Sequence, residues 1–100
     1  MLIAKWRKLT TTVLGEASGN TDKMRGEAKL IYAKATSSDT RFDFKMLDKD
    51  GDEILLEEGN VGALRLRDPL YLEGIYTWSI ENASADEIFT IAIQLRETVT

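Results

Sequence analysis

A chain of 100 residues has room for one hydrophobic core, so residues 1–100 are predicted to form a single domain. Its 43% hydrophobic residues and net charge of −4 are typical of a folded globular protein and exclude a disordered chain. The sequence has no Cys and no His, which removes disulfides, thiolate nucleophiles, and the most common general base and transition-metal ligand. We therefore expect a protein that is not an enzyme and has no cofactor.

Charge is unevenly distributed along the chain. Residues 1–50 hold 10 basic and 7 acidic side chains, whereas residues 51–100 hold 3 and 10. This asymmetry can steer copies together head to tail or let an acidic face meet a basic partner, and it vanishes in space if strands from the two halves interleave. The acidic total argues against a nucleic-acid partner, because such binding needs cations that neutralise phosphates.

The first predicted strand is Leu2–Leu9. After Met1, only the three apolar residues Leu2 to Ala4 precede the first cation, which is too few for a signal peptide. No stretch of the chain approaches the ~18 apolar residues of a membrane span. The sequence therefore predicts neither secretion nor a membrane partner, and the absence of Cys fits a reducing cytoplasm.

A tryptophan in this strand stands among cations. Trp6 is flanked by Lys5, Arg7 and Lys8. An indole in that setting is either covered by the basic side chains or buried against another subunit. We therefore predict an interface formed by Trp6, Lys5, Arg7 and Lys8, with stacking of Trp6 on a sugar ring as the alternative.

The stretch Thr10–Gly26 is rich in turn-forming residues, among them Gly15, Gly19 and Asn20. It is predicted to be a long loop, with one strand near Thr10–Leu14 as the alternative. Residues 1–26 would then form an N-terminal arm and a long loop available to a partner. The next predicted strand is Ala28–Ala35.

Strict alternation of apolar and charged residues predicts a half-buried antiparallel strand over Arg41–Leu47. Its inward residues are Phe42, Phe44 and Met46. Asp50 and Gly51 follow, and Asp-Gly is among the strongest hairpin signals. The sequence therefore predicts a tight turn there and a returning strand over Glu53–Glu57.

The same turn resembles the opening of an EF-hand calcium loop. Asp48, Asp50 and Asp52 stand at the first, third and fifth positions of such a loop. The match then fails, because Glu53 stands where the loop needs Gly and Gly59 stands where it needs a bidentate Glu. We predict a hairpin without a metal, with a weak structural calcium site at the three aspartates as the alternative.

The second half contains the clearest strands. Tyr76–Ile80 and Phe89–Leu95 alternate strictly between apolar and other residues, and Ala63–Arg67 is a weaker candidate. The segment Asp68–Gly74 is predicted to cross between two sheets and cover one end of the core, because Pro69 cannot donate a hydrogen bond to a sheet.

About seven strands at intervals of about ten residues, with no helical stretch, predict an all-β fold. This pattern predicts an antiparallel β-sandwich of the jelly-roll type.

The last two strands carry a resemblance to a known class of proteins. Residues Gly74–Asn82 have the form G-x-Y-x-W-x-I-x-N, and a short turn leads to the long alternating strand Glu87–Arg96. Over about residues 40–97 the chain resembles small β-sandwich virion proteins of tailed bacteriophages, including capsid decoration (cement) proteins, and also secreted binding modules.

The resemblance implies a structural virion protein that self-associates, with a trimer favoured, and that decorates or stabilises a phage capsid. Its implied partners are copies of itself and a major capsid protein or another virion protein. Its implied location is the virion, which assembles in the host cytoplasm. The alternatives are a carbohydrate-binding or adhesion module, and a phage tail or baseplate component of the same fold.

Overall fold

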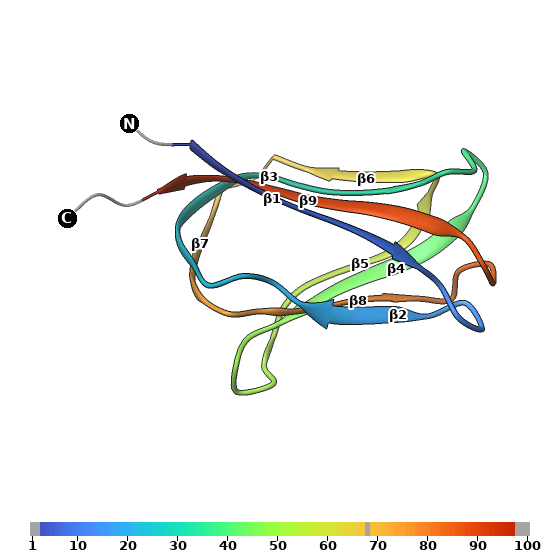
Figure 1. The fold of residues 1–100 in the computed structure, drawn as a ribbon, viewed down its shortest axis with the longest axis horizontal. Coiled ribbons are helices and arrows are strands. Elements are labelled where there is room, and N and C mark those ends of the chain that lie inside the picture. Colours follow the sequence, from blue (N-terminus) through green and yellow to red (C-terminus); the bar gives the residue numbers. More distant parts are fainter. Residues whose placement is uncertain (1–2, 68, 98–100) are drawn as a thin grey trace.

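The computed structural model describes residues 3–67 and 69–97, and that part of the chain forms nine strands (Figure 1). Among these residues there is no helix of the length and apolar character needed to cross a membrane. The strands are β1 (Ile3–Thr11), β2 (Ala17–Asn20), β3 (Met24–Ala35), β4 (Arg41–Leu47), β5 (Glu53–Val61), β6 (Ala63–Leu66), β7 (Leu70–Gly74), β8 (Thr77–Glu81) and β9 (Ile88–Glu97).

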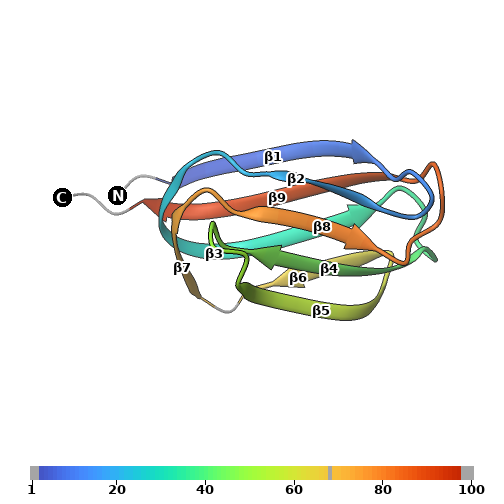
Figure 2. The same cartoon turned by 90° about the horizontal axis from the view of Figure 1, so that it is seen from below.

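The strands form two antiparallel layers that pack face to face; Figure 1 shows them edge-on, and in Figure 2 one layer lies over the other. One layer has the order β1-β9-β3-β6, with β7 also paired to β3, and the other has the order β5-β4-β8-β2. The layers join at one corner, where Val61 of β5 pairs with Ala63 of β6 on either side of Gly62. On the other side of the sandwich, β1 and β2 are the two ends of the strand order.

The pairing follows the winding of a jelly roll. β6 and β7 both lie along β3 and together act as one interrupted strand. Counted in this way, the first strand pairs with the last, the second with the last but one, the third with the interrupted strand, and the fourth with the fifth. This nested pairing in two sheets confirms the predicted antiparallel, jelly-roll-like sandwich.

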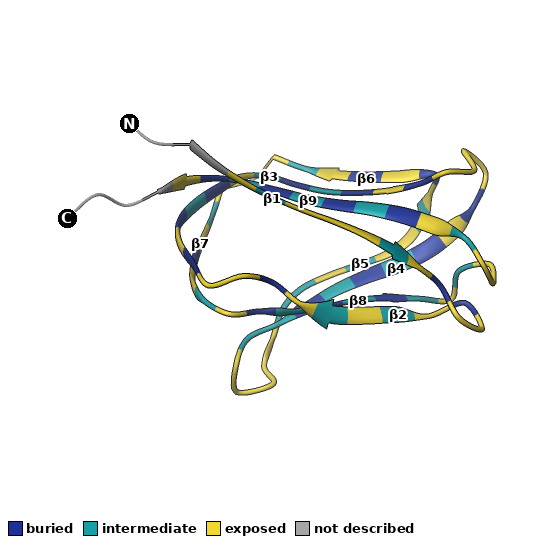
Figure 3. Cartoon of the chain, viewed as in Figure 1, coloured by how far each residue is buried: buried dark blue, intermediate teal, exposed yellow. Residues whose placement is uncertain are grey.

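Alternating residues of the central strands meet between the layers (Figure 3). Phe42, Phe44 and Met46 are fully buried, as their alternation predicted. The predicted inward residues of β8 and β9 are buried as well. The rings of Phe42 and Phe89 lie edge to face across the two layers, with centroids 4.9 Å apart.

The long loop and N-terminal arm expected over residues 1–26 are wrong for the described part of that range, which excludes Met1 and Leu2. β1 pairs with β9 along its whole length, and Ala17–Asn20 forms β2 against β8. β2 is hard to recognise in the sequence because Gly19, and not an apolar residue, occupies its inward position opposite Trp78. A Cβ at Gly19 would lie 2.8 Å from Cζ2 of Trp78, so the core ring requires Gly there.

The expected crossing over residues 68–74 is also corrected, although Asp68 itself lies outside the described residues. Leu70–Gly74 is strand β7, which pairs with the first half of β3. Pro69 separates β6 from β7, as its missing N–H predicts, but both strands stay on the same layer. Leu72 enters the core, whereas Tyr71 is exposed, so this segment covers the core end only in part.

A carboxylate ties together the connections at one end of the sandwich. Glu87 accepts hydrogen bonds from the hydroxyl of Thr36 at 2.6 Å and from the N–H of Ser37 at 2.7 Å. The buried hydroxyl of Thr12 donates to the carbonyl of Ser84 at 2.6 Å and accepts from the N–H of Glu87 at 3.0 Å. The hydrogen bond from Thr36, then that from Ser37, lowers the pKa of Glu87 from its ordinary value of 4.5.

This network makes part of the stability depend on pH. Because the folded pKa of Glu87 is lowered, its contribution is present above about pH 4.5 and is lost as the pH falls through the folded pKa. We expect Glu87→Gln to lower the free energy of unfolding at neutral pH, and the gap to wild type to close in acid. Urea unfolding at both pH values measures this, with Glu58→Gln on exposed β5 as the control. A gap that stays constant in acid would show that the charge of Glu87 does not matter.

Candidate functional site

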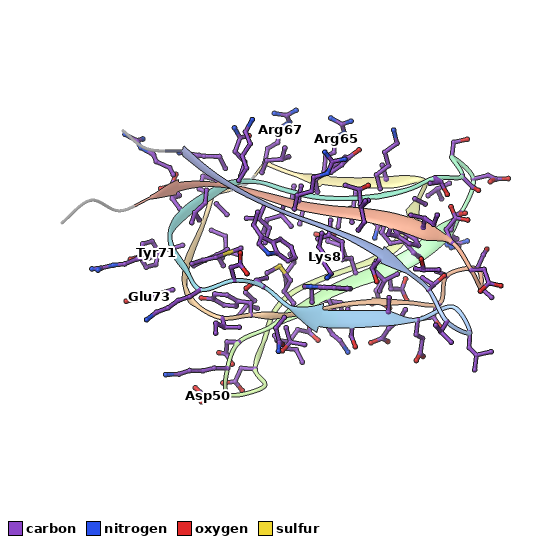
Figure 4. All side chains as sticks on the ribbon, viewed as in Figure 1. Lys8, Asp50, Arg65, Arg67, Tyr71 and Glu73 are labelled. Carbon is purple, nitrogen blue, oxygen red and sulfur yellow. The ribbon has the colours of Figure 1, made fainter. Side chains whose placement is uncertain are left out.

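The outward side of the layer β1-β9-β3-β6 gathers cations. Residues that alternate with the core residues of a strand point away from the core, so each of these strands sends its cations to the same surface. Figure 4 shows Arg65 and Arg67 projecting away from this layer. We call this surface the basic face; it comprises the exposed residues Lys5, Arg7, Lys34, Arg65, Arg67 and Arg96.

Acidic groups offset this charge only in part. Among the described side chains of β1, β3, β6, β7 and β9, the carboxylates are those of Glu27 on β3 and Glu73 on β7. Glu27 forms an ion pair with Lys29, and this hydrogen bond lowers the pKa of the carboxyl group. The basic face therefore keeps a net positive charge although the whole chain is acidic.

A trough of about 660 Å³ runs along β9 on the basic face. Its floor is formed by the short side chains of Thr90 and Ala92. The register places longer side chains of β1 on one side of β9 and of β3 on the other. The walls include Lys5, Arg7, Tyr32 and Lys34, so cations stand on both sides of the hollow.

One arginine of the basic face is held in place by an aromatic ring. The guanidinium carbon of Arg65 lies 4.9 Å from the centroid of the Tyr32 ring, in a cation–π contact. Tyr32 and Arg65 are cross-strand partners on β3 and β6. The contact therefore orders the Arg65 side chain beside the trough, so a partner that binds there causes little further loss of side-chain entropy.

The predicted interface residues separate onto the two sides of β1. Lys5 and Arg7 point outward and belong to the basic face. Trp6 pairs with Ile93, is partly buried and packs against the core. Lys8 lies on the same side as Trp6, and Figure 4 shows it between the two layers. An inward-pointing lysine on an edge strand also discourages pairing with a further strand.

Sequence reasoning missed the other four cations of the basic face: Lys34, Arg65, Arg67 and Arg96. Alternation alone predicts that these side chains point outward from their strands. Their convergence depends on β6, β3 and β9 being neighbours, which local sequence does not reveal. The basic face takes three of its cations from each half of the chain, so the halves interleave, and the charge is uneven between the two faces of the sandwich rather than between the two halves of the sequence.

The outward side of the other layer, β5-β4-β8-β2, carries mostly carboxylates. We call it the acidic face; it comprises Asp43, Glu53, Glu58 and Glu81. Two cations, Arg41 and Lys45, share this surface. The Nζ of Lys45 lies 2.9 Å from Oε1 of Glu81, and this hydrogen bond raises the pKa of Lys45.

Asp43 is anchored within the acidic face. Its carboxylate accepts hydrogen bonds from the N–H of Gly59 at 2.8 Å and from Nδ2 of Asn82 at 2.6 Å. These bonds, the one from Gly59 first, lower the pKa of Asp43. The carboxylate of Asp43 on β4 is therefore fixed by hydrogen bonds from β5 and from the β8–β9 connection.

The predicted hairpin joins β4 to β5, and its tip gathers three carboxylates. Asp48, Asp50 and Asp52 have carboxylate oxygens within 4.8 Å of one another, and Figure 4 shows Asp50 at the bottom of the view, at this hairpin. Such oxygens are the ligands that calcium prefers. One oxygen of Asp48 also closes the turn, accepting the N–H groups of Asp50 and Asp52, each at 2.9 Å.

No protein-family model matches this chain, and no curated protein gives a significant match. The chemistry of the surfaces is therefore what bears on function. A rigid sheet that presents six cations offers a positive potential to an anionic partner and steers the encounter with it.

Proposed function

We propose that the protein is a non-enzymatic structural protein that self-associates and joins a larger assembly, and that this assembly is a phage virion whose capsid it decorates or stabilises. The observation that carries the proposal is the basic face, a broad and rigid surface suited to an acidic protein surface. Such contacts with a charged protein need shape and charge complementarity and no reactive group.

Binding by mass action is how such a protein would act. A subunit that binds only the assembled form of its partner adds its binding free energy to the stability of that form. A jelly-roll sandwich suits this role because its strands are hydrogen-bonded to their neighbours and packed on a shared core, which keeps a docking face rigid. Jelly rolls occur in viral capsids and also in lectins, so this fold-level analogy supports the proposal without deciding it.

A carbohydrate-binding or adhesion module is the second candidate. The trough along β9, with Tyr32 and cations on its walls, favours it because an anionic oligosaccharide can lie in such a hollow. The aspartate tip would add calcium to this alternative. A phage tail or baseplate component would use the same surfaces as a capsid protein, and only the identity of its partner would differ.

Light scattering after size exclusion, with and without calcium, tests the proposal. We expect the 11.2 kDa chain to form an oligomer whose mass and melting temperature do not change with calcium. A calcium-sensitive monomer would contradict the proposal. So would saturable binding of a sulfated or uronic-acid oligosaccharide that is lost in Tyr32→Ala.

A further inference from the structure

The two outward faces of the sandwich carry opposite charge and lie back to back. Figure 1 shows the two layers edge-on, and Figure 4 shows Arg65 and Arg67 on one side and Asp50 on the other. The basic face presents six cations, and the acidic face presents four carboxylates with Arg41 and Lys45 among them, beside the three aspartates of the hairpin tip. Each molecule therefore offers a cationic surface and its anionic complement in opposite directions.

Few of these charges are satisfied within the chain. Among the described residues, ion pairs join Lys29 to Glu27 and Lys45 to Glu81. Neither pair includes a cation of the basic face, and neither includes Glu53 or Glu58 of the acidic face. Both faces therefore keep charges that a neighbouring molecule can pair.

We propose that the basic face of one copy binds the acidic face of a second copy, so that copies of this chain associate head to tail. The inference rests on the proposed function, which includes self-association, and it assigns that association to two surfaces.

Charge decides between this arrangement and a two-fold dimer. A two-fold contact places a surface against the same surface of its partner, so cations would face cations or carboxylates would face carboxylates. Like charges placed opposite each other oppose association. A head-to-tail contact joins unlike charges and is the arrangement that complementarity favours.

The outline of each face is comparable in size to a protein interface. The longest and shortest extents of the molecule are 43 Å and 19 Å, which set an upper bound of about 800 Å² on each face. A standard protein interface buries about 800 Å² on each partner. Both faces also expose apolar side chains that gain from burial: Leu9 and Ile88 beside the basic face, Leu56 and Val61 on the acidic face.

The arrangement predicts an open stack. Because the two faces point in opposite directions, a bound copy still offers one free face to a further copy. Head-to-tail contacts of this kind extend as chains unless a rotation closes them into a ring. The expected behaviour is therefore a mass that grows with concentration and does not stop at a trimer.

Sedimentation velocity of the purified chain over a range of concentrations tests the inference. At about 20 mM salt we expect the average mass to rise above 11.2 kDa with concentration, and at about 500 mM salt to return to the monomer because the charges are screened. The double variant Lys34→Glu/Arg65→Glu should weaken association about 100-fold, and so should Glu53→Lys/Glu58→Lys. Mixing the two variants should restore association.

A matched control separates the faces from total charge. Lys8→Glu/Lys23→Glu changes the net charge as much as Lys34→Glu/Arg65→Glu, but Lys8 faces the space between the layers and Lys23 lies in the β2–β3 connection. This control should associate like the wild type. Thermal unfolding checks that each variant, all at exposed positions, retains its fold.

Three outcomes would overturn the inference. They are a wild type that stays monomeric at low salt, a control that dissociates as much as the face variants, and a closed trimer that the face reversals leave intact. The closed trimer would still agree with the proposed function. A monomer whose basic face binds an anionic oligosaccharide would contradict both.

Discussion

Trp78→Ala is expected to lower the free energy of unfolding by about 3–5 kcal/mol, a large share of the ~5–15 kcal/mol that stabilises a domain of this size. Trp78 is 2% exposed and is the largest of the fully enclosed side chains. It lies on β8 between its partners on β4 and β2, so its loss leaves a cavity bordered by three strands of one layer. Urea unfolding followed by circular dichroism measures the change.

A double-mutant cycle with Gly19 identifies the cause. Gly19→Ala should also destabilise the protein, because the added Cβ would lie 2.8 Å from Cζ2 of Trp78. In a Trp78→Phe background the smaller ring makes room, so Gly19→Ala should cost less there than in the wild type. Equal costs in the two backgrounds would show that the ring does not restrict this position.

For the single variant Trp78→Ala, a small loss of unfolding free energy would contradict the packing of β8 around this side chain.

Gly62→Ala is expected to cost about 3 kcal/mol, since it combines backbone strain with a steric collision. Gly62 has a φ of +75° at the corner where β5 passes into β6. A Cβ there would lie 2.4 Å from the carbonyl oxygen of Ser38. The same Gly donates to the carbonyl of Thr40 at 2.7 Å and accepts from the N–H of Ala35 at 2.9 Å, so the corner cannot move freely.

Gly51→Ala is the matched control for this corner. Gly51 has a similar φ of +83°, but a Cβ there meets nothing within 4 Å. It should therefore cost only the strain of the left-handed conformation, about 1–2 kcal/mol. The difference between the two variants in thermal or urea unfolding measures the collision with Ser38. If both variants lose the same stability, the connection at Ser38 moves aside.

The strands with strict alternation were predictable because their signal is local. Each inward residue of β4, β8 and β9 is separated by one polar or small residue from the next, which is the pattern of a strand with one buried face. β2 and β7 gave no such signal. In β2, Gly19 stands at a core position and leaves space for the ring of Trp78. In the other segment, Pro69 indicated a break in the chain, and only the pairing of β7 with β3 shows that the chain continues in the same layer after that break.

The candidate site was predictable only in part for a similar reason. Lys5 and Arg7 are close together in the sequence, and their clustering was evident. Lys8 and Trp6 were grouped with them, although a period of two sends neighbouring residues to opposite sides of a strand. Arg65 comes from a strand more than fifty residues away, and only its pairing with Tyr32 places it on the same face.

Local sequence is enough to establish an antiparallel all-β fold, because alternation, turn residues and the absence of helical periodicity are local properties. Which strands are neighbours, and therefore which charges share a surface, follows only from the packing of the whole chain. Pairing such as β1 with β9 joins residues from the two ends of the chain. Its register is chosen by burial of the whole core, so no short stretch of sequence contains it.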